Sequence, residues 1–219
     1  MPMEEQNRQI TLLVTAFEPF GGETRNASLD AVARLPAQCG AVRIVRQTVP
    51  TAFGTSVKTV IEAIQREQPD AVLMVGQAGS RGILTPERQA VNRIRARIPD
   101  NAGVQPAEQP VVPGGSPCMQ ATLPVEEITR AIRDAGVPAA VSEDAGAFVC
   151  NQLLYGVLHD LSNRERPIPA GFLHVPRSEE QTEGRQPALP LAQIVAGLTA
   201  AVGAVAAHLT EEHREERKQ

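Results

Sequence analysis

The segment "ITLLVTAFEPFGG", residues 10–22, begins as a short and nearly continuous apolar run and ends in a proline, a phenylalanine and two glycines. A run of this length that is rich in β-branched residues is typical of a buried strand. Proline and paired glycines are typical of the loop that follows such a strand. The sequence therefore predicts a buried strand from Ile10 to Phe17 and a loop immediately after it.

Helical and strand patterns alternate along the rest of the chain. Apolar residues at helical spacing predict helices near residues 26–35, 51–68, 125–135 and 148–161, and from residue 191 onward. Strand-like runs lie at residues 42–49, 69–79, 138–143 and 170–176. This alternation predicts an α/β fold, a three-layer sandwich in which helices flank a twisted, mostly parallel central sheet. We expect a single domain over residues 1–219, with a long loop at residues 98–118 and a polar tail from about residue 210.

Composition argues against several classes of protein. The chain has 21 Lys+Arg and 25 Asp+Glu, so it has no basic excess to attract nucleic acid or an anionic membrane. Its three cysteines form no CxxC pair, which fits neither a disulfide framework nor a structural zinc site, and we expect no metal. The first residues are polar and acidic, so we expect no export signal and a cytoplasmic location. The apolar run from Ile194 predicts a packed helix rather than a membrane span.

Cys150 is the first candidate for chemistry. It lies in "AGAFVCNQLLYGVLH", residues 145–159, near the start of a predicted helix. A thiol at a helix N-terminus feels the positive end of the helix dipole, which favours the reactive thiolate. The alternative is a structural role, because free cysteine is among the most buried residue types and usually behaves as a small apolar residue. The helix position alone favours this structural alternative.

His174 changes that balance. It lies in "GFLHVP", at the carboxyl end of a predicted strand, and the carboxyl ends of strands border the ligand crevice in open α/β sheets. The other histidines, His159, His208 and His213, lie in predicted helices or near the C-terminus. A strand histidine is more often structural than catalytic. His174 nevertheless has the position of a base that could act on a cysteine nucleophile.

Glu87 is the candidate for a third residue that orients the imidazole. It lies in "GQAGSRGILTPERQAVN", residues 76–92, after another strand that ends near Gly76. The pattern here is ambiguous between a short helix and an extended segment. A solvated charge beside Arg88 is therefore the alternative interpretation of Glu87.

Four separated motifs resemble, in order, the signatures of the pyroglutamyl peptidase type I family, also called pyrrolidone-carboxylate peptidases. They are "VTAFEPFGG", "GQAGSRGILTPERQAVN" followed by "ARIPDNAGVQP", "AGAFVCNQLLYGVLH", and "FLHVP". The resemblance runs from about Leu12 to the terminal helix. It implies a cytoplasmic α/β cysteine peptidase that needs no cofactor, is often a homotetramer, and acts on peptides with an N-terminal pyroglutamyl residue.

The resemblance also implies roles for particular residues. It places the nucleophile on Cys150, the general base on His174 and the acidic orienter on Glu87. The arginine on the oxyanion side matches Arg97. The pocket for the substrate ring matches six residues, namely Phe17, Phe20, Gln77, Ile98, Phe148 and Val149.

Two other functions stay open from the residues alone. A cysteine amidase that cleaves a different small amide would keep Cys150, His174 and Glu87 but bind another ring. A binding protein without catalytic activity would use Cys150 only as part of its core. Alkylation of the thiol separates the two classes, because a catalytic thiol reacts quickly near neutral pH and a packed one does not.

Overall fold

The computed structural model describes residues 9–182 and 187–216, and its centre is a six-stranded sheet. The strands lie in the order β2-β3-β1-β4-β8-β5. Their bounds are β1 Thr11–Phe17, β2 Gln38–Cys39, β3 Val42–Val49, β4 Ala71–Gln77, β5 Thr85–Glu87 and β8 Ala170–Val175. The four central strands β3, β1, β4 and β8 are parallel, whereas β2 and β5 run antiparallel at the two edges. A separate antiparallel pair joins β6 (Gln89–Val91) to β7 (Cys118–Gln120).

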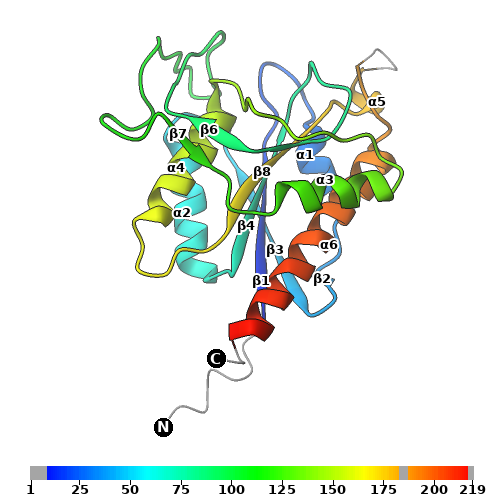
Figure 1. The fold of residues 1–219 in the computed structure, drawn as a ribbon. Helices are drawn as coiled ribbons and strands as arrows, with labels where there is room; N and C mark the ends of the chain where they lie inside the picture. The colour runs from blue at the N-terminus through cyan, green and yellow to red at the C-terminus, as the bar shows by residue number, and fades with distance from the viewer. Residues whose placement is uncertain (1–8, 183–186, 217–219) are drawn as a thin grey trace.

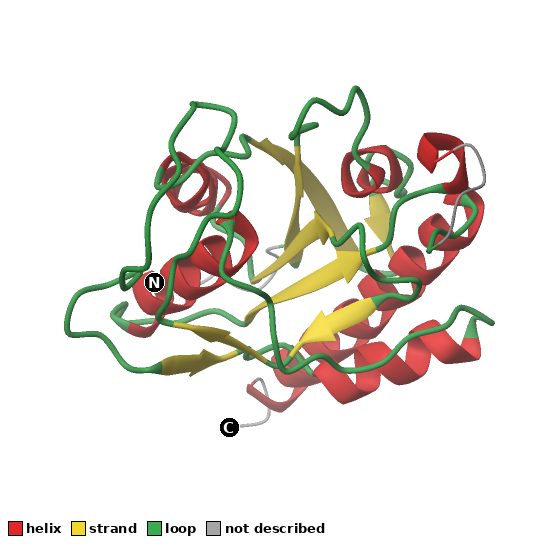
Figure 2. Cartoon of the chain, turned by 90° about the horizontal axis from the view of Figure 1, so that it is seen from above, coloured by secondary structure: helices red, strands yellow, loops and turns green. Residues whose placement is uncertain are grey.

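Helices cover both faces of the sheet (Figure 1). Their bounds are α1 Ala27–Val32, α2 Thr55–Glu67, α3 Val125–Asp134, α4 Val149–Ser162, α5 Glu179–Thr182 and α6 Leu191–Glu216. α2 and α4 lie on one face, and α1, α3 and α6 lie on the other (Figure 1). The view from above shows helices on both sides of the sheet (Figure 2). The sequence forms this sandwich because neighbouring residues of a strand point to opposite faces. In β1, Leu12 and Val14 enter the core under α6, while Leu13 enters the core under α4.

The structure confirms the predicted α/β sandwich and corrects one of its strands. Residues 138–143 form no regular strand; they make two isolated bridges, Leu84 with Ala139 and Glu87 with Ser142. The partner segment contains Pro86, which has no amide hydrogen to donate to a continuous ladder. The ambiguous segment around Glu87 is extended and forms β5.

The last helix, α6, is long and apolar enough to cross a membrane by length and composition alone. Its apolar residues are nevertheless part of the main core, where Ile194, Leu198, Val202 and Val205 are at most 1% exposed. This agrees with the packed helix that the sequence predicts. α6 continues to Glu216, so the polar tail expected from about residue 210 begins inside the helix. The N-terminal segment expected to lack an export signal falls mostly on residues 1–8, outside the described residues.

The loops after the parallel strands gather at the carboxyl edge of the sheet, at the top of Figure 1. β4 ends at Gln77 and β8 ends at Val175, side by side in the sheet. The predicted sites of chemistry therefore meet at one edge, where open α/β sheets bind ligands.

Candidate active site

Cys150 occupies the second position of α4, which begins at Val149. The chain enters the helix through Gly146, whose φ of 83° is unfavourable for residues with a side chain. The side chain of Asp144 accepts a hydrogen bond from the Gly146 N–H at 2.8 Å and so stabilises this turn. Phe148 is the N-cap residue of α4 and has an extended backbone. Its side chain accepts no hydrogen bond from the N–H groups of the first turn.

The sulfur of Cys150 lies against β4 at Gly76. A Cβ placed on Gly76 would be only 3.1 Å from Sγ of Cys150. The register of the sheet pairs Gly76 with His174 on the neighbouring strand β8. The pairing of β4 with β8 and the packing of α4 on β4 therefore place the thiol and the imidazole on the same face of the sheet, over neighbouring strands.

Glu87 contacts the imidazole from the edge strand β5. Nδ1 of His174 lies 2.7 Å from Oε1 of Glu87, and both side chains are buried. Burial raises the pKa of the Glu87 carboxyl, but the hydrogen bond and charge of His174, with help from Ser142 and Arg81, lower it by more. The net result is a pKa below the ordinary value, so Glu87 is a carboxylate that can hold Nδ1–H and leave Nε2 free to take a proton.

The ionisation of Cys150 differs from what the helix position predicts. Burial raises the pKa of the thiol to about 12, the negative charge of Glu87 adds to this increase, and Arg81 opposes it. Desolvation therefore outweighs the helix dipole in the free protein. The thiol is neutral near pH 7 and needs a base to remove its proton.

Aromatic side chains surround the reactive groups. The ring of Phe172 lies 4.6 Å from the imidazole of His174, measured between centroids, and 6.4 Å from the ring of Phe17. On the helix side, Phe148 contacts Phe20 at 6.2 Å and Phe53 at 5.2 Å. Val149 and Phe17 are fully buried, while Phe148 is partly exposed. The five phenylalanines and Val149 carry no charge, so this side of the site is apolar.

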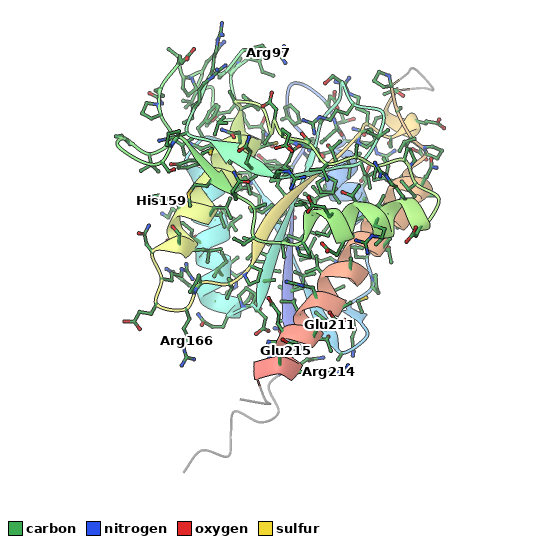
Figure 3. All side chains as sticks on the ribbon, in the orientation of Figure 1. Arg97, His159, Arg166, Glu211, Arg214 and Glu215 are labelled. Carbon is green, nitrogen blue, oxygen red and sulfur yellow. The ribbon has the colours of Figure 1, made fainter. Side chains whose placement is uncertain are left out.

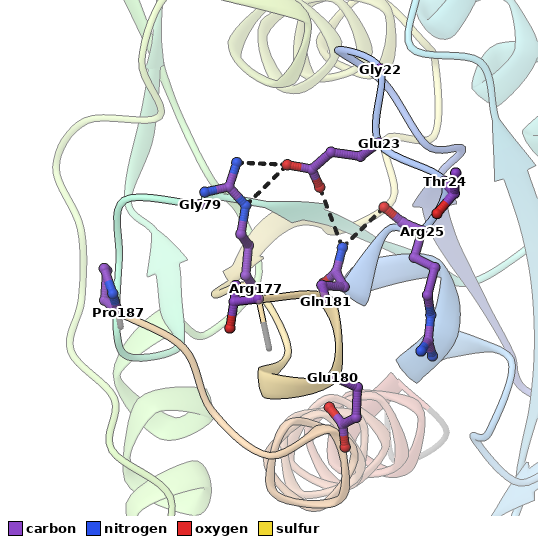
Figure 4. Close-up of a pocket in the computed structure, with 10 residues that line it drawn as sticks. Gly22, Glu23, Thr24, Arg25, Gly79, Arg177, Glu180, Gln181 and Pro187 are labelled. Atoms are coloured by element: carbon purple, nitrogen blue, oxygen red, sulfur yellow. Dashed lines mark hydrogen bonds and ion pairs between the residues drawn. The ribbon is translucent and has the colours of Figure 1, made fainter. Parts of the chain in front are cut away.

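The side chain of Gln77 is already occupied by protein contacts. Its Oε1 accepts from the N–H of Ala27 at 2.8 Å, and its Nε2 donates to Glu23 at 3.2 Å. Glu23 also pairs with Arg177 at 2.6 Å and accepts from Gln181, at the rim of a pocket of about 570 Å³ (Figure 4). Gln77 therefore has only its backbone groups to offer a ligand in this structure.

Arg97 and Ile98 are both exposed and lie in a loop outside the helices and strands. Arg97 is exposed and lies near the top of the molecule (Figure 3). Ile98 is 44% exposed, and its Cδ1 would be 3.8 Å from a Cβ on Gly21, so it lies over the loop that follows β1. Asn101 anchors this part of the chain by donating to Glu18 at 2.9 Å.

The sequence interpretation missed two residues that organise the site. Arg81 contacts Glu87 Oε1 at 2.5 Å, although nothing in the local pattern points to this pairing. Asn151 is fully buried and bonds the N–H and the carbonyl of Val91 and the carbonyl of Arg93, which fixes the start of α4 against β6. A polar residue on the buried face of an apolar helix was the available signal for Asn151.

Within residues 9–182 and 187–216, no group of three or more His, Cys, Asp or Glu side chains could hold a metal ion.

Comparison with known proteins gives the family. A family model described as pyroglutamyl peptidase matches residues 10–208. The chain belongs to the pyroglutamyl peptidase family. Among its relatives, a pyrrolidone-carboxylate peptidase of Levilactobacillus brevis is 47% identical over 196 residues, which cover 89% of this chain and 96% of that protein.

Solved structures of pyroglutamyl peptidases have the same fold. Pyroglutamyl peptidase I of Bacillus amyloliquefaciens is 43% identical with a TM-score of 0.87, covering 91% of this chain and 98% of that one. A mutant pyrrolidone carboxyl peptidase of Pyrococcus furiosus is 31% identical with a TM-score of 0.86, covering 91% of this chain and 100% of that one. These matches confirm the family that the motifs predict, and with it the class of the enzyme, a cysteine hydrolase of the pyroglutamyl peptidase type.

Proposed function

We propose that Cys150, His174 and Glu87 form the catalytic triad that hydrolyses the amide bond after an N-terminal pyroglutamyl residue. One observation carries this assignment. Glu87 and His174 make a buried contact of 2.7 Å. His174 lies on β8 opposite Gly76 of β4, and the sulfur of Cys150 lies over Gly76. Acyl transfer by a thiol requires a nucleophile, a base that takes its proton and a carboxylate that orients the base.

The reaction begins with proton transfer, because the Cys150 thiol is neutral in the free enzyme. His174 takes the thiol proton as the sulfur attacks the carbonyl carbon of the pyroglutamyl residue. Glu87 stabilises the imidazolium that forms. The tetrahedral intermediate then collapses, and His174 returns the proton to the leaving amine, which leaves a thioester on Cys150. His174 next removes a proton from water, the resulting attack releases pyroglutamate, and the proton goes back to the thiolate.

The oxyanion of the tetrahedral intermediate forms beside the start of α4. Backbone N–H groups of an uncapped helix start are suitable donors for this charge. We assign Arg97 to the same side of the site by resemblance to the family. Arg97 is exposed, and two residues before it the N–H of Arg95 donates to the carbonyl oxygen of Ala147 at 2.8 Å, so this segment lies beside the loop that leads into α4.

The ring of the substrate is assigned to the apolar side of the site. Phe20 and Phe148, which are partly exposed, supply uncharged surface there, and Phe17 and Val149 are buried in the core on the same side. Ile98 covers the entrance from the loop, and Gln77 contributes its backbone groups because its side chain is committed to Ala27 and Glu23. An uncharged surface of this kind favours binding of a neutral lactam ring.

The remaining assignments rest on resemblance to the family. The protein acts in the cytoplasm and assembles as a homotetramer. A single peptidase domain spans residues 1–219. The shared sheet between the two cores supports the single domain. Analytical ultracentrifugation of the purified protein measures the oligomeric state directly.

The assay that tests the proposed function uses pyroglutamyl-aminomethylcoumarin with purified protein. Wild type should release the fluorophore, and Cys150→Ser should keep its circular dichroism spectrum but lose nearly all turnover. Cys118→Ser is the matched control, because Cys118 is also partly buried but lies on β7, and it should retain activity. Substantial turnover by Cys150→Ser would show that the nucleophile is another group.

A further inference from the structure

Arg81 makes three polar contacts from the turn that follows β4. Its guanidinium donates to Oε1 of Glu87 at 2.5 Å and to the carbonyl oxygen of Asp144 at 2.7 Å, and it also contacts Oγ1 of Thr85. The side chain is only 24% exposed, so these contacts face inward. A single arginine thus joins the orienting carboxylate to the loop that leads into the nucleophile helix.

The contact between Arg81 and Glu87 compensates a buried negative charge. Glu87 is fully buried, and its Oε1 accepts both from Arg81 and from the imidazole of His174. A buried carboxylate without a counter-charge is strongly destabilising. While His174 is neutral, Arg81 is the cation that contacts Glu87 among the described residues.

We propose that Arg81 is a positioning residue of the reaction, which compensates the charge of Glu87 and fixes the approach of the Cys150 loop through Asp144. This inference rests on the proposed catalytic triad. With Arg81 in place, Glu87 orients His174 as one half of a neutral pair. The pair then opposes the ionisation of Cys150 less than a lone carboxylate would.

The electrostatics of the thiol agree with this role. Burial raises the pKa of Cys150, the negative Glu87 raises it further, and the positive Arg81 lowers it. The groups whose charges meet here come from three elements, Glu87 from β5, His174 from β8 and Cys150 from α4. Without Arg81, the Glu87–His174 pair would bind a proton more tightly and the thiol would release its proton less readily. Both changes move the active pH range upward.

The test compares Arg81→Gln, which removes the charge, with Arg81→Lys, which keeps it. The first readout is the pH dependence of Cys150 alkylation by iodoacetamide, followed peptide by peptide in a mass spectrometer because Cys39 and Cys118 also react. The second is the pH profile of kcat/KM on pyroglutamyl-aminomethylcoumarin. Arg88→Gln is the matched control, since Arg88 also pairs with two carboxylates but at the surface.

We expect Arg81→Gln to slow the alkylation of Cys150 roughly tenfold at each pH below the pKa of the thiol, which corresponds to an upward shift of the profile by about one pH unit. The acidic limb of kcat/KM should move in the same direction. Arg81→Lys should keep the wild-type alkylation rate at each pH while kcat falls, because lysine lacks the planar fork that reaches Glu87 and Asp144 together. Arg88→Gln should match wild type in both readouts.

A charge-pair variant keeps the proposal testable if Arg81→Gln does not fold. The double substitution Arg81→Gln with Glu87→Gln replaces both charges of the pair and leaves the site neutral, as in the wild-type pair. Glu87→Gln alone should make the alkylation of Cys150 faster at a fixed pH, and the double variant should return the rate to near the wild-type value. A double variant that alkylates as fast as Glu87→Gln overturns the proposal, as does an Arg81→Gln protein whose two pH profiles match wild type.

The two readouts also separate this inference from the proposed function. Alkylation needs no substrate. If wild type does not cleave the pyroglutamyl substrate but Arg81→Gln still shifts the alkylation profile, the proposed function is wrong and the effect of Arg81 on the thiol remains. Normal cleavage with unshifted profiles would overturn the role of Arg81 alone.

Discussion

The sulfur of Cys150 lies over the position that a side chain on Gly76 would occupy, at the point where the sheet meets α4. A Cβ on Gly76 would lie 3.1 Å from Sγ of Cys150 and 2.7 Å from Cζ of Phe172. Both separations are shorter than van der Waals contact, so any larger residue must displace the thiol or the ring that lies beside His174. Glycine at this position is therefore a requirement of the site as well as of the core.

Gly76→Ala should lower kcat/KM by of order 10², because small displacements of reacting groups have effects of this size, while overpacking destabilises the fold by about 1–3 kcal/mol. Gly203→Ala is the control, since a Cβ there meets nothing within 4 Å in α6. It should leave activity unchanged. Steady-state kinetics and thermal unfolding measure both effects, and a fully active Gly76→Ala enzyme would contradict the contact.

The positions of Cys150 and His174 could be predicted from the sequence because they depend on local patterns. A helix-periodic run places the cysteine near a helix start, and a buried strand ending in proline places the histidine at the carboxyl edge of the sheet. The contact of Glu87 with His174 could not be derived in this way. β5 has only three residues and contains Pro86, too short for a period of two to be recognised, and its antiparallel pairing with β8 depends on the tertiary fold.

Electrostatic features were the least predictable part of the site. The helix position of Cys150 favours a thiolate, but the pKa follows burial, which is known only when the packing is known. The contact of Arg81 with Glu87 depends on a turn at residues 78–81, where the N–H of Arg81 donates to the carbonyl of Ala78 at 3.0 Å. Neither the turn nor its long-range target leaves a periodic signal in the sequence.

Glu87→Gln should lower kcat more than it raises KM, because an orienting group acts on the transition state through His174 rather than on the bound substrate. The effect should be smaller than that of replacing Cys150 or His174. Kinetics at several substrate concentrations separate the two constants. A raised KM with unchanged kcat would make Glu87 a binding residue instead.

The same variant should change acid stability. The pKa of Glu87 is lower in the folded protein than its ordinary value of 4.5, because contacts with His174 outweigh the opposing effect of burial. Its charge therefore favours the folded state above about pH 4.5, and this contribution is lost as the pH falls through the lowered pKa. Glutamine does not titrate, so the Tm of Glu87→Gln should depend less steeply on pH in the acid range than that of wild type.

Gln77→Ala should act on the loop that carries Phe20 rather than on substrate directly. The substitution leaves the buried N–H of Ala27 without its acceptor, which destabilises the protein by about 1–3 kcal/mol. It also frees Glu23 from one of its contacts. We expect a lower Tm together with a higher KM. An unchanged Tm with a large rise in KM would indicate that the side chain of Gln77 contacts the substrate itself.

Arg97→Ala tests whether the exposed arginine reaches the oxyanion during turnover. Loss of one donor to a developing oxyanion lowers kcat by of order 10² or more. Arg95→Ala is the matched control, since Arg95 is exposed in the same arginine-rich stretch and should not affect kcat. Equal activity of the two variants would leave Arg97 as a surface residue.

Selectivity for the lactam follows from the apolar surface around the triad. Phe20 and Phe148 border the proposed ring pocket, Phe17 and Val149 are buried beside it, and none of these four side chains carries a charge. Pyroglutamate is flat and neutral, with one N–H donor and one carbonyl acceptor, and backbone groups such as those of Gln77 can satisfy both.

Analogues that differ only in charge or in one carbonyl should therefore be rejected. An N-terminal glutamate would bring an amine and a carboxylate into this surface, and burying an unpaired charge is very costly. An N-terminal proline keeps the ring but lacks the carbonyl and carries a positive charge, which leaves polar groups of the site unpaired. Sites of this kind reject such analogues by roughly 10⁴-fold or more. In one assay, pyroglutamyl-Ala should be cleaved and the matching Pro-Ala and Glu-Ala peptides should not; comparable turnover of Pro-Ala would rule out the lactam pocket and leave the cysteine mechanism intact.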